Sequence, residues 1–188
     1  MSNHCQGAPS HTQEKRKIPW RMIFGVGALV LLAVLLRGFV VHPRRIVSGS
    51  MEPTLVAGDR LVVDTLSYRV HPPRAGDVVV FEPPPELVRS GDLREYTAIK
   101  RVIALPGQEV WVRDGQVVVD GKPLQEPYVA AAPTYQWGPA RVPEDRLFVL
   151  GDNRNASSDS HVWGPLPRRS VTGRAWLRFW PPERAGAL

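Results

Sequence analysis

The sequence predicts a mostly β protein, in which a single N-terminal transmembrane helix precedes a largely antiparallel β domain. An uncharged apolar run lies near the N-terminus, and short β-branched runs bounded by turn residues follow it. No helical segments alternate with those runs, which argues against a parallel α/β sheet. The 19 prolines among 188 residues favour short strands and fixed turns, because proline interrupts helices and central strands.

The apolar run begins at Met22. The segment MIFGVGALVLLAVLL carries no charge, and after Arg37 the letters GFVV extend the run to Val41. About 20 such residues are enough for a helix to cross a bilayer, and Arg37 near one end can reach the headgroups. The alternative is a cleaved signal peptide with Lys15–Lys17 as its basic region. We favour a retained anchor, because no A-x-A cleavage site follows the run.

We therefore expect three parts: an N-terminal tail (1–21), a transmembrane helix (22–41) and a β-rich domain (42–188). The net charge of +6 suits an anionic lipid surface better than nucleic acid, because the basic residues are scattered and form no block. The positive-inside rule favours a cytoplasmic N-terminus by a narrow count, since basic residues stand on both sides of the segment: Lys15, Arg16, Lys17 and Arg21 before it, and Arg37, Arg44 and Arg45 after it.

The first strands are predicted from β-branched runs between turn residues. Arg60–Val63 (RLVV) follows an AGD triplet, and Asp77–Phe81 (DVVVF) begins at the aspartate of RAGD. Tyr96–Leu105 (YTAIKRVIAL) is a longer run that ends at Pro106–Gly107. In EVWVRDGQVVVDG, the pair Asp114–Gly115 separates two alternating runs. This pattern predicts a hairpin with a type I′ turn.

The last strand candidates are Leu147–Leu150 and Arg174–Trp180. In the second, strict alternation would place Trp176, Arg178 and Trp180 on one face and Leu177 and Phe179 on the other. Other segments are expected to lie outside the main sheet: Glu86–Glu95 as a surface excursion, Ala130–Pro143 as a loop, and about 108–143 as a small hairpin excursion.

Two serines flank a glycine in IVSGSMEPTL, which runs from Ile46 to Leu55. A serine hydroxyl needs a base to act as a nucleophile. Of the five histidines, only His161 lies in a dense polar cluster, GDNRNASSDSH. A Ser50–His161–Asp159 triad stays open as an alternative, although an aspartate two positions before its own histidine is poorly placed to orient the ring.

Lys100 is the other candidate base. It lies inside TAIKRVIAL, with Ala98 and Val102 as neighbours on the same face. An apolar setting disfavours the ammonium and lowers its pKa, so that a neutral amine can accept a proton. On residue type alone, a strand lysine with its head in water is commoner. Arg101 next to it illustrates the ambiguity, because one of the two is expected to face outward.

Five strings occur in an order that resembles the type I signal peptidases: SGSMEPTL, AGDRLVV, RAGDVVVF, IKRVIALPG and GDNRNASSDSHVWGPLP. These are membrane-anchored Ser/Lys endopeptidases that remove signal peptides from exported preproteins. The resemblance implies that activity, preproteins and the lipid bilayer as partners, no cofactor, and small residues flanking the cut. It also implies a single-pass protein of the cell membrane with an extracytoplasmic catalytic domain, and the translocation machinery is an expected neighbour.

The resemblance also implies roles for individual residues. Ser50 matches the nucleophile and Lys100 the general base, while the Ser48 hydroxyl joins the Ser50 backbone N–H in the oxyanion hole. Ser157 matches a serine that orients the lysine amine, and Asp159 a carboxylate that supports the site. Asp152 and Arg154 belong to the same motif. His161 stands where the family often has an arginine; histidine holds no fixed charge at neutral pH, but it can donate a hydrogen bond to Asp159.

Two other functions are weighed against this one. Self-cleaving repressors also use a Ser/Lys pair, but they are soluble and carry a DNA-binding domain. A catalytically silent, membrane-anchored β adaptor is the second alternative. The sequence offers no metal-ligand spacing, no phosphate-binding loop and only net charge in favour of nucleic acid. Aromatic residues are candidates for a membrane-facing surface or for the core of the sheet: Trp163, Trp176, Phe179 and Trp180.

Overall fold

The computed structural model describes residues 20, 24–29, 31, 41–90 and 97–188. These residues fall into two units, one within residues 1–35 and one within 36–188, and each is considered by itself. In the first unit, residues 24–29 are helical. The predicted transmembrane segment at 22–41 lies mostly outside the described residues. Among the residues that are described, no helix is both long and apolar enough to cross a membrane.

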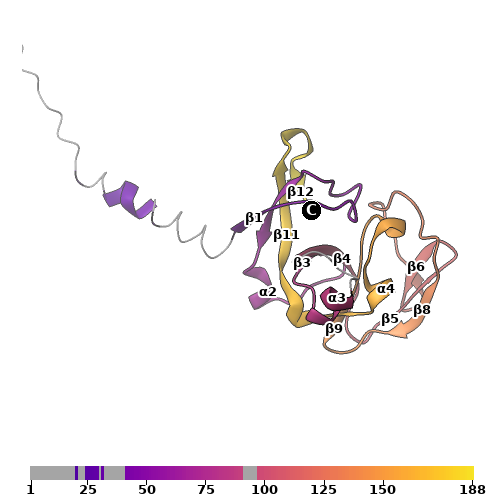
Figure 1. The fold of residues 1–188 in the computed structure, drawn as a ribbon. Coiled ribbons are helices and arrows are strands. Elements are labelled where there is room, and N and C mark those ends of the chain that lie inside the picture. The colour runs from indigo at the N-terminus through magenta and orange to yellow at the C-terminus, as the bar shows by residue number, and fades with distance from the viewer. Residues whose placement is uncertain (1–19, 21–23, 30, 32–40, 91–96) are drawn as a thin grey trace, which may run out of the picture. The chain divides into compact units, whose positions relative to one another are not determined.

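The second unit is built mainly of antiparallel strands (Figure 1), so the expected fold class is confirmed for this part of the chain. Its larger sheet has the strand order β1-β2-β11-β3-β4-β9-β10, and β12 pairs with β11. These strands are β1 (Val41–Arg45), β2 (Arg60–Asp64), β3 (Val78–Phe81), β4 (Ala98–Ala104), β9 (Arg146–Leu150), β10 (Leu166–Pro167), β11 (Val171–Trp180) and β12 (Gly186–Ala187).

A second sheet lies within the segment for which the sequence predicts a hairpin excursion. Its strand order is β7-β6-β5-β8. The four strands are β5 (Glu109–Arg113), β6 (Gln116–Val119), β7 (Lys122–Pro123) and β8 (Trp137–Arg141). The predicted hairpin of β5 and β6 is confirmed, because Asp114 and Gly115 both have positive φ, at 53° and 76°, as a type I′ turn requires.

Short helices occupy the connections between the strands. They are α2 (Ser67–Val70), α3 (Pro85–Ser90) and α4 (Ser160–Trp163), with 3-10 turns η1 (Arg154–Ala156), η2 (Arg168–Ser170) and η3 (Pro182–Arg184). Helix α3 occupies the first part of the predicted surface excursion at Glu86–Glu95, and residues 91–96 lie outside the described residues.

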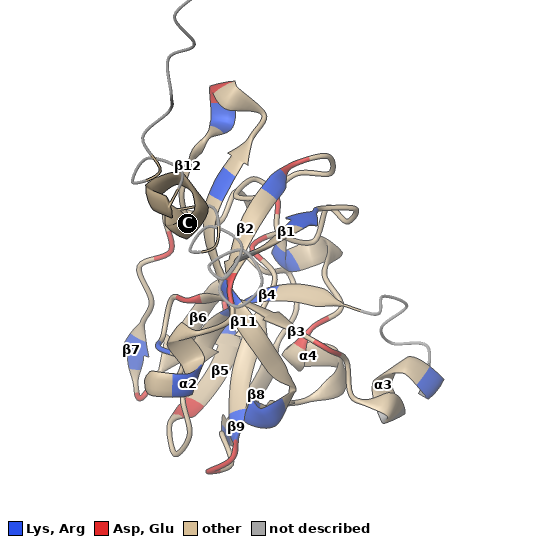
Figure 2. Ribbon diagram, turned by 90° about the vertical axis from the view of Figure 1, so that its left-hand side faces the viewer, with Lys and Arg blue, Asp and Glu red and all other residues tan. Residues whose placement is uncertain are grey.

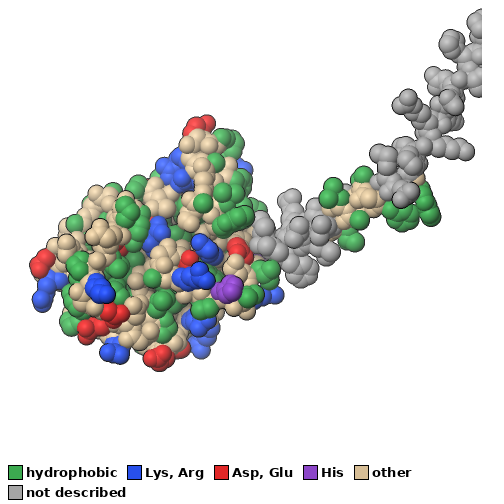
Figure 3. Space-filling view, turned by 180° about the vertical axis from the view of Figure 1, so that it is seen from behind, with side chains coloured by type: hydrophobic (Ala, Val, Ile, Leu, Met, Phe, Trp, Pro, Cys, Tyr) green, Lys and Arg blue, Asp and Glu red, His purple; other side chains and the backbone are tan. Residues whose placement is uncertain are grey.

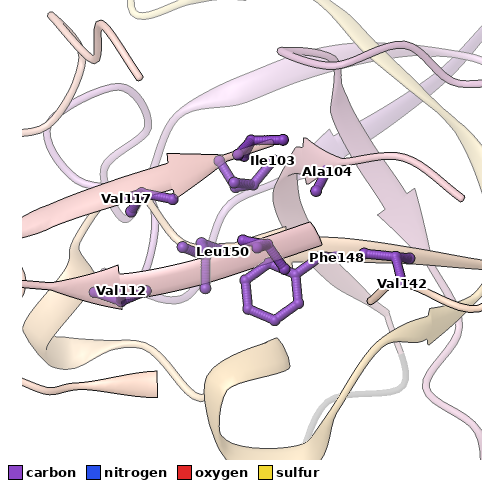
Figure 4. Packing of buried hydrophobic residues seen from close by; sticks show 9 residues of the cluster. Ile103, Ala104, Val112, Val117, Val142, Phe148 and Leu150 are labelled. Atoms are coloured by element: carbon purple, nitrogen blue, oxygen red, sulfur yellow. The ribbon is translucent and has the colours of Figure 1, made fainter. Parts of the chain in front are cut away.

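Three apolar clusters form the core, and β4 contributes to more than one of them. Figure 4 shows the cluster that joins the two sheets, in which Ile103 and Ala104 of β4 lie beside Phe148 and Leu150 of β9. A second cluster contains Met51 and Leu55 from the connection between β1 and β2, together with residues of β2 and β3. Strand β4 connects these clusters, because it also contributes Ala98 and Val102 to the third cluster and packs Ile99 against the second.

Three local expectations are wrong or incomplete, and each has a backbone cause. Strands β1 and β8 are missing from the sequence prediction, because each contains a proline, Pro43 and Pro139, a residue that demotes a run as a strand signal. Strict alternation in β11 also fails. The register shifts between Ala175 and Leu177 and again between Arg178 and Trp180, and each bulge shifts the inward and outward pattern by one residue.

Candidate active site

Ser50 lies on the connection between β1 and β2, which we call the serine turn (residues 46–59). Backbone hydrogen bonds from Ile46 N to Asp59 O (2.8 Å) and from Gly58 N to Ile46 O (2.9 Å) close its two ends. Met51 and Leu55 are buried in the second core cluster. Ile46, before Ser50, belongs to the same cluster. Because apolar side chains before and after it are held in the core, the half-buried Ser50 is fixed in place.

Lys100 lies in the middle of β4, between strands β3 and β9. Its side chain is buried, with only 4% of the residue exposed. The Lys100 Nζ atom lies 2.6 Å from Ser50 Oγ, a hydrogen-bonding distance, although the residues are 50 positions apart in sequence. Burial favours the neutral form of an amine over the charged form, so this geometry suits a proton acceptor for the serine hydroxyl.

Ser48 lies on the same turn, two residues before Ser50. The Ser50 backbone N–H donates to Ser48 Oγ at 3.3 Å, so the N–H and the Ser48 hydroxyl are close enough to contact one oxygen atom together. Two such donors at one point are the basis of an oxyanion hole.

Gly151 and Asn153, from the GDNRNASSDSH motif, contact the backbone of the serine turn at Gly49 and Ser50. The Asn153 backbone N–H donates to Ser50 O at 3.1 Å, and Asn153 Nδ2 donates to Gly49 O, also at 3.1 Å. A Cβ atom on Gly151 would lie 2.4 Å from Ser50 O and 2.3 Å from Ser157 Oγ. Glycine is therefore needed at position 151 for the motif to approach the turn this closely.

Ser157 lies next to Gly151. Its Oγ atom is buried and makes no hydrogen bond within the described part of the chain. The predicted contact between the Ser157 hydroxyl and the Lys100 amine therefore stays a prediction. Burial of an unsatisfied hydroxyl costs about 1–3 kcal/mol, so a partner for this oxygen would be favourable.

The expectation that either Lys100 or Arg101 faces outward is wrong, because both are buried. Arg101 forms a two-pronged ion pair with Asp152, through Nε at 2.9 Å and Nη2 at 2.7 Å, and its guanidinium lies over the Tyr128 ring. The Thr54 hydroxyl donates to the same Asp152 carboxylate at 2.5 Å. Asp152 thus connects the serine turn to the strand that carries Lys100.

Asp159 lies at the N-cap of helix α4, and His161 lies in the first turn of that helix. Asp159 caps this helix by accepting a hydrogen bond from the His161 backbone N–H. Its Oδ1 atom also lies 2.7 Å from His161 Nδ1, so the expectation that this aspartate is poorly placed to orient the ring is wrong. Its other oxygen accepts a hydrogen bond from Gly151 N at 2.8 Å. Asp159 therefore holds both the histidine and the Gly151 backbone.

The His161 ring stacks on Tyr135, with 3.9 Å between ring centroids. Burial raises the pKa of Tyr135, and the nearby charge of Asp159 raises it further, so the phenol is neutral.

The hydrogen bond described for Ser50 Oγ is with Lys100. The lysine is therefore better supported as the base than His161.

Arg154, the remaining charged residue of the motif, is completely buried. It pairs with Glu126 through two hydrogen bonds, of 2.9 Å and 2.6 Å, and its Nε donates to Gly151 O at 3.0 Å. Burial alone would lower the pKa of this guanidinium, but hydrogen bonding and charge attraction from Glu126 raise it above its ordinary value. Arg154 thus stays charged and braces Gly151.

A cleft of about 350 Å³ opens beside Ser48 and Ser50. Its apolar lining includes Ile46, Met51 and Ile99, and Arg44 and Arg45 also line it. An apolar cleft of this kind can hold the side chains of an extended peptide. Among the described residues, no group of three or more His, Cys, Asp or Glu side chains is arranged to hold a metal ion.

Comparison with known proteins decides the family. The family model described as "Signal peptidase, peptidase S26" matches residues 20–180. The chain belongs to the signal peptidase family.

Two relatives of this signal peptidase family member match over most of their own length. The chain is 48% identical over 181 residues to "Signal peptidase I" of Leptolyngbya laminosa, covering 96% of this chain and 89% of the relative. It is 53% identical over 174 residues to "Probable signal peptidase I-1" of Synechocystis sp., covering 93% and 86%. A solved signal peptidase I from Enterococcus faecalis V583 is 30% identical, with a TM-score of 0.46, covering 56% of this chain and 97% of that chain.

The family resemblance predicted from the motifs is thus confirmed. Sequence reasoning missed the residues that support the site from a distance: Thr54, Arg101, Glu126 and Tyr135. Thr54 and Arg101 lie inside the quoted motifs SGSMEPTL and IKRVIALPG, so their positions were a usable signal. Glu126 and Tyr135 lie outside those motifs, and only the tertiary fold brings them to Arg154 and His161.

Proposed function

We propose that this member of the signal peptidase family cleaves signal peptides from exported preproteins, with Ser50 as nucleophile and Lys100 as general base. The observation that carries the proposal is the 2.6 Å distance between Ser50 Oγ and the buried Lys100 Nζ. A silent adaptor would have no need for a buried lysine against a serine hydroxyl. The family match argues against a self-cleaving repressor.

In the proposed reaction, the neutral Lys100 amine takes the hydroxyl proton while Ser50 Oγ bonds to the scissile carbonyl carbon. The carbonyl oxygen becomes an oxyanion, which accepts hydrogen bonds from the Ser50 N–H and the Ser48 hydroxyl. Loss of one such donor commonly costs about 10²–10³ in rate. The Lys100 ammonium then gives its proton to the leaving nitrogen as the C–N bond breaks.

The product of this step is an ester between Ser50 and the signal peptide. Lys100, neutral again, takes a proton from a water molecule that attacks the ester carbonyl. The proton returns to Ser50 Oγ as the C–O bond breaks, and the free enzyme is restored. The same amine therefore serves both halves of the reaction.

We assign the apolar cleft to the residues before the cut. Ile46, Met51 and Ile99 line a space of about 350 Å³ beside Ser50, which suits small apolar side chains of an A-x-A pattern. We also propose supporting roles for four residues of the GDNRNASSDSH motif that lie around Gly151: Asp152, Ser157, Asp159 and His161. Arg154 is placed behind Gly151 as a brace.

We further propose that the β domain lies on the extracytoplasmic face of the cell membrane, with a cytoplasmic N-terminus and residues 22–41 as the anchor. The exposed aromatic side chains of β11 support contact with lipid: Trp176, Phe179 and Trp180. Figure 3 shows hydrophobic side chains on the projecting hairpin of β11 and β12. Trp163 is only partly exposed and packs against the third core cluster. Lipid and the translocation machinery are the proposed neighbours, because the substrate itself is held in the membrane.

The test is cleavage of a purified preprotein by the full chain in detergent. Ser50→Ala and Lys100→Ala should each abolish product, whereas Lys122→Ala, a change at an exposed lysine on the second sheet, should cleave normally. His161→Ala should keep part of the activity. If Lys100→Ala still cleaves while His161→Ala is inactive, the base is the histidine and the proposed mechanism is wrong.

A further inference from the structure

Two arginines of the β11–β12 hairpin reach the backbone of the serine turn. Arg178 on β11 donates through Nη1 to Thr54 O, and through Nε to Arg184 O. Arg184, in the 3-10 turn between the two strands, donates through Nη2 to Pro53 O at 3.2 Å and to Thr54 O at 3.4 Å. The two serine-turn carbonyls that accept from these arginines, Pro53 O and Thr54 O, lie three and four residues after Ser50.

Asp59, at the other end of the serine turn, fixes both guanidinium groups. Its Oδ2 atom lies 3.5 Å from Arg178 Nη1 and 3.2 Å from Arg184 Nη2, and it also accepts a hydrogen bond from Val56 N at 3.0 Å. The carboxylate is buried. A buried charge needs a partner, so Asp59 constrains where the two arginines can lie.

The views agree with these contacts. In Figure 1 the hairpin end (yellow) and the connection after β1 (purple) lie at the same end of the domain. Figure 2 shows that the hairpin carries Lys or Arg together with Asp or Glu near its tip. The hairpin thus lies against the turn that carries the nucleophile, although about 124 residues separate Arg178 from Thr54 in sequence.

We propose that Arg178 and Arg184 are positioning residues for Ser50, and that the β11–β12 hairpin acts as a clamp on the serine turn. This inference rests on the proposed function of Ser50. Thr54 is held from two sides: its carbonyl accepts from the clamp, and its hydroxyl donates to Asp152, which pairs with Arg101 beside Lys100. The clamp therefore fixes the nucleophile relative to the strand that carries the base.

The shape of the guanidinium group explains why arginine suits position 178. Arg178 uses two different nitrogens to contact two carbonyls on separate segments, which the planar fork of a guanidinium permits and the single ammonium of lysine does not. Arg178→Lys should keep the charge beside Asp59 but lose one of the two carbonyl contacts. The Arg178→Lys variant can therefore separate an effect on the position of Ser50 from an effect on the stability of the fold.

The experiment compares full-length Arg178→Ala, Arg178→Lys and Arg184→Gln with the wild-type protein in detergent. A matched control is Arg174→Ala, because Arg174 lies on the same strand and pairs with an aspartate, Asp77, away from the serine turn. Cleavage of a purified preprotein gives kcat and KM, and circular dichroism gives the thermal midpoint. A displacement of about 1 Å at a reacting group can cost about 100-fold in rate, so kcat of Arg178→Lys should fall by up to that factor with KM little changed.

The decisive comparison is between kcat and stability. The clamp is supported if Arg178→Lys has a thermal midpoint close to wild type and a reduced kcat, while Arg174→Ala has normal kcat. It is overturned if all folded arginine variants cleave with wild-type kcat while Ser50→Ala is inactive. Cleavage by Ser50→Ala would instead refute the proposed function itself. Should Arg178→Ala fail to fold, the lysine and Arg184→Gln variants still decide the question.

Discussion

Replacing Gly151 with alanine should disable cleavage and leave the β domain folded. Gly151 is the point where the GDNRNASSDSH motif meets the serine turn, and it does not need a left-handed backbone. Alanine is therefore acceptable to the local chain conformation. Its effect comes from the added methyl group, which meets Ser50 O and Ser157 Oγ.

The size of the clash can be worked out from the contacts. The new Cβ would lie 2.4 Å from Ser50 O, whereas ordinary contact begins at 3.4 Å, so the shortfall is 3.4 − 2.4 = 1.0 Å. The Ser157 hydroxyl can rotate away, but the Ser157 Cβ atom, 2.7 Å from the new Cβ, cannot. The Ser50 carbonyl is backbone and accepts a hydrogen bond from Asn153 N. The turn itself must move. A shift of that size is expected to lower kcat about 100-fold, while overpacking costs about 1–3 kcal/mol of stability.

The assay measures preprotein cleavage and thermal unfolding on the same samples. Gly186→Ala is the control, because a Cβ at Gly186 meets no atom within 4 Å. Gly151→Ala should lose most of kcat at a temperature where both variants are folded, and Gly186→Ala should lose none. A folded Gly151→Ala protein with wild-type kcat would refute the reasoning, because it would show that the position of Ser50 tolerates a 1.0 Å displacement of its turn.

Three further predictions concern stability. Arg154→Met leaves the Glu126 carboxylate without its charged partner and should cost about 3–5 kcal/mol, while the double variant Arg154→Met/Glu126→Gln should recover part of that loss in urea unfolding. Gly115→Ala forces alanine to a φ of 76° and should cost about 1–2 kcal/mol in the same assay, with kcat unchanged. Burial opposes the charge of Asp64, but hydrogen bonds from Ser67 and Leu66 outweigh it and lower the pKa of Asp64. The stabilisation is present above the ordinary aspartate pKa of about 3.9 and is lost as the pH falls through the folded pKa. Ser67→Ala should therefore weaken the acid dependence of unfolding, and an unchanged dependence as the pH falls from about 5 to about 2 would contradict the assignment.

The sequence predicts the parts of the fold that local pattern controls. The strands at Arg60–Val63 and Asp77–Phe81 and the Asp114–Gly115 turn carry their own signals, in β-branched runs and in turn chemistry, and all three are present. Strand β8 is missed because it contains Gly138 and Pro139, and its position depends on pairing with β5. Pairing between strands is a tertiary effect that a local pattern does not encode.

The site, like the fold, was predictable where a local motif marks its residues and not where tertiary contacts decide. The motifs predict which residues to examine, and Ser50 and Lys100 do lie in contact. The surroundings of Lys100 were only partly predictable. For a strand with one face in water, the sequence pattern predicts that one of two neighbouring residues is exposed. Arg101 escapes that rule since Asp152 and Tyr128 cover it on the opposite face. A buried arginine is compatible with a strand only when such partners arrive from elsewhere in the fold.

The buried charges around the serine turn have a common arrangement, in which each pair joins two separate elements. Asp152 joins the GDNRNASSDSH motif to β4 through Arg101. Glu126, between β7 and β8, joins the second sheet to the motif through Arg154. Asp59 joins the serine turn to β11 through Arg178. Removing a charge from water costs several kcal/mol, and well-packed apolar residues often stabilise a protein as much or more. Stability alone therefore does not explain three such pairs around one hydroxyl. Ion pairs are directional where apolar contacts are not, so we infer that these pairs serve to fix Ser50 and Lys100 at a single distance.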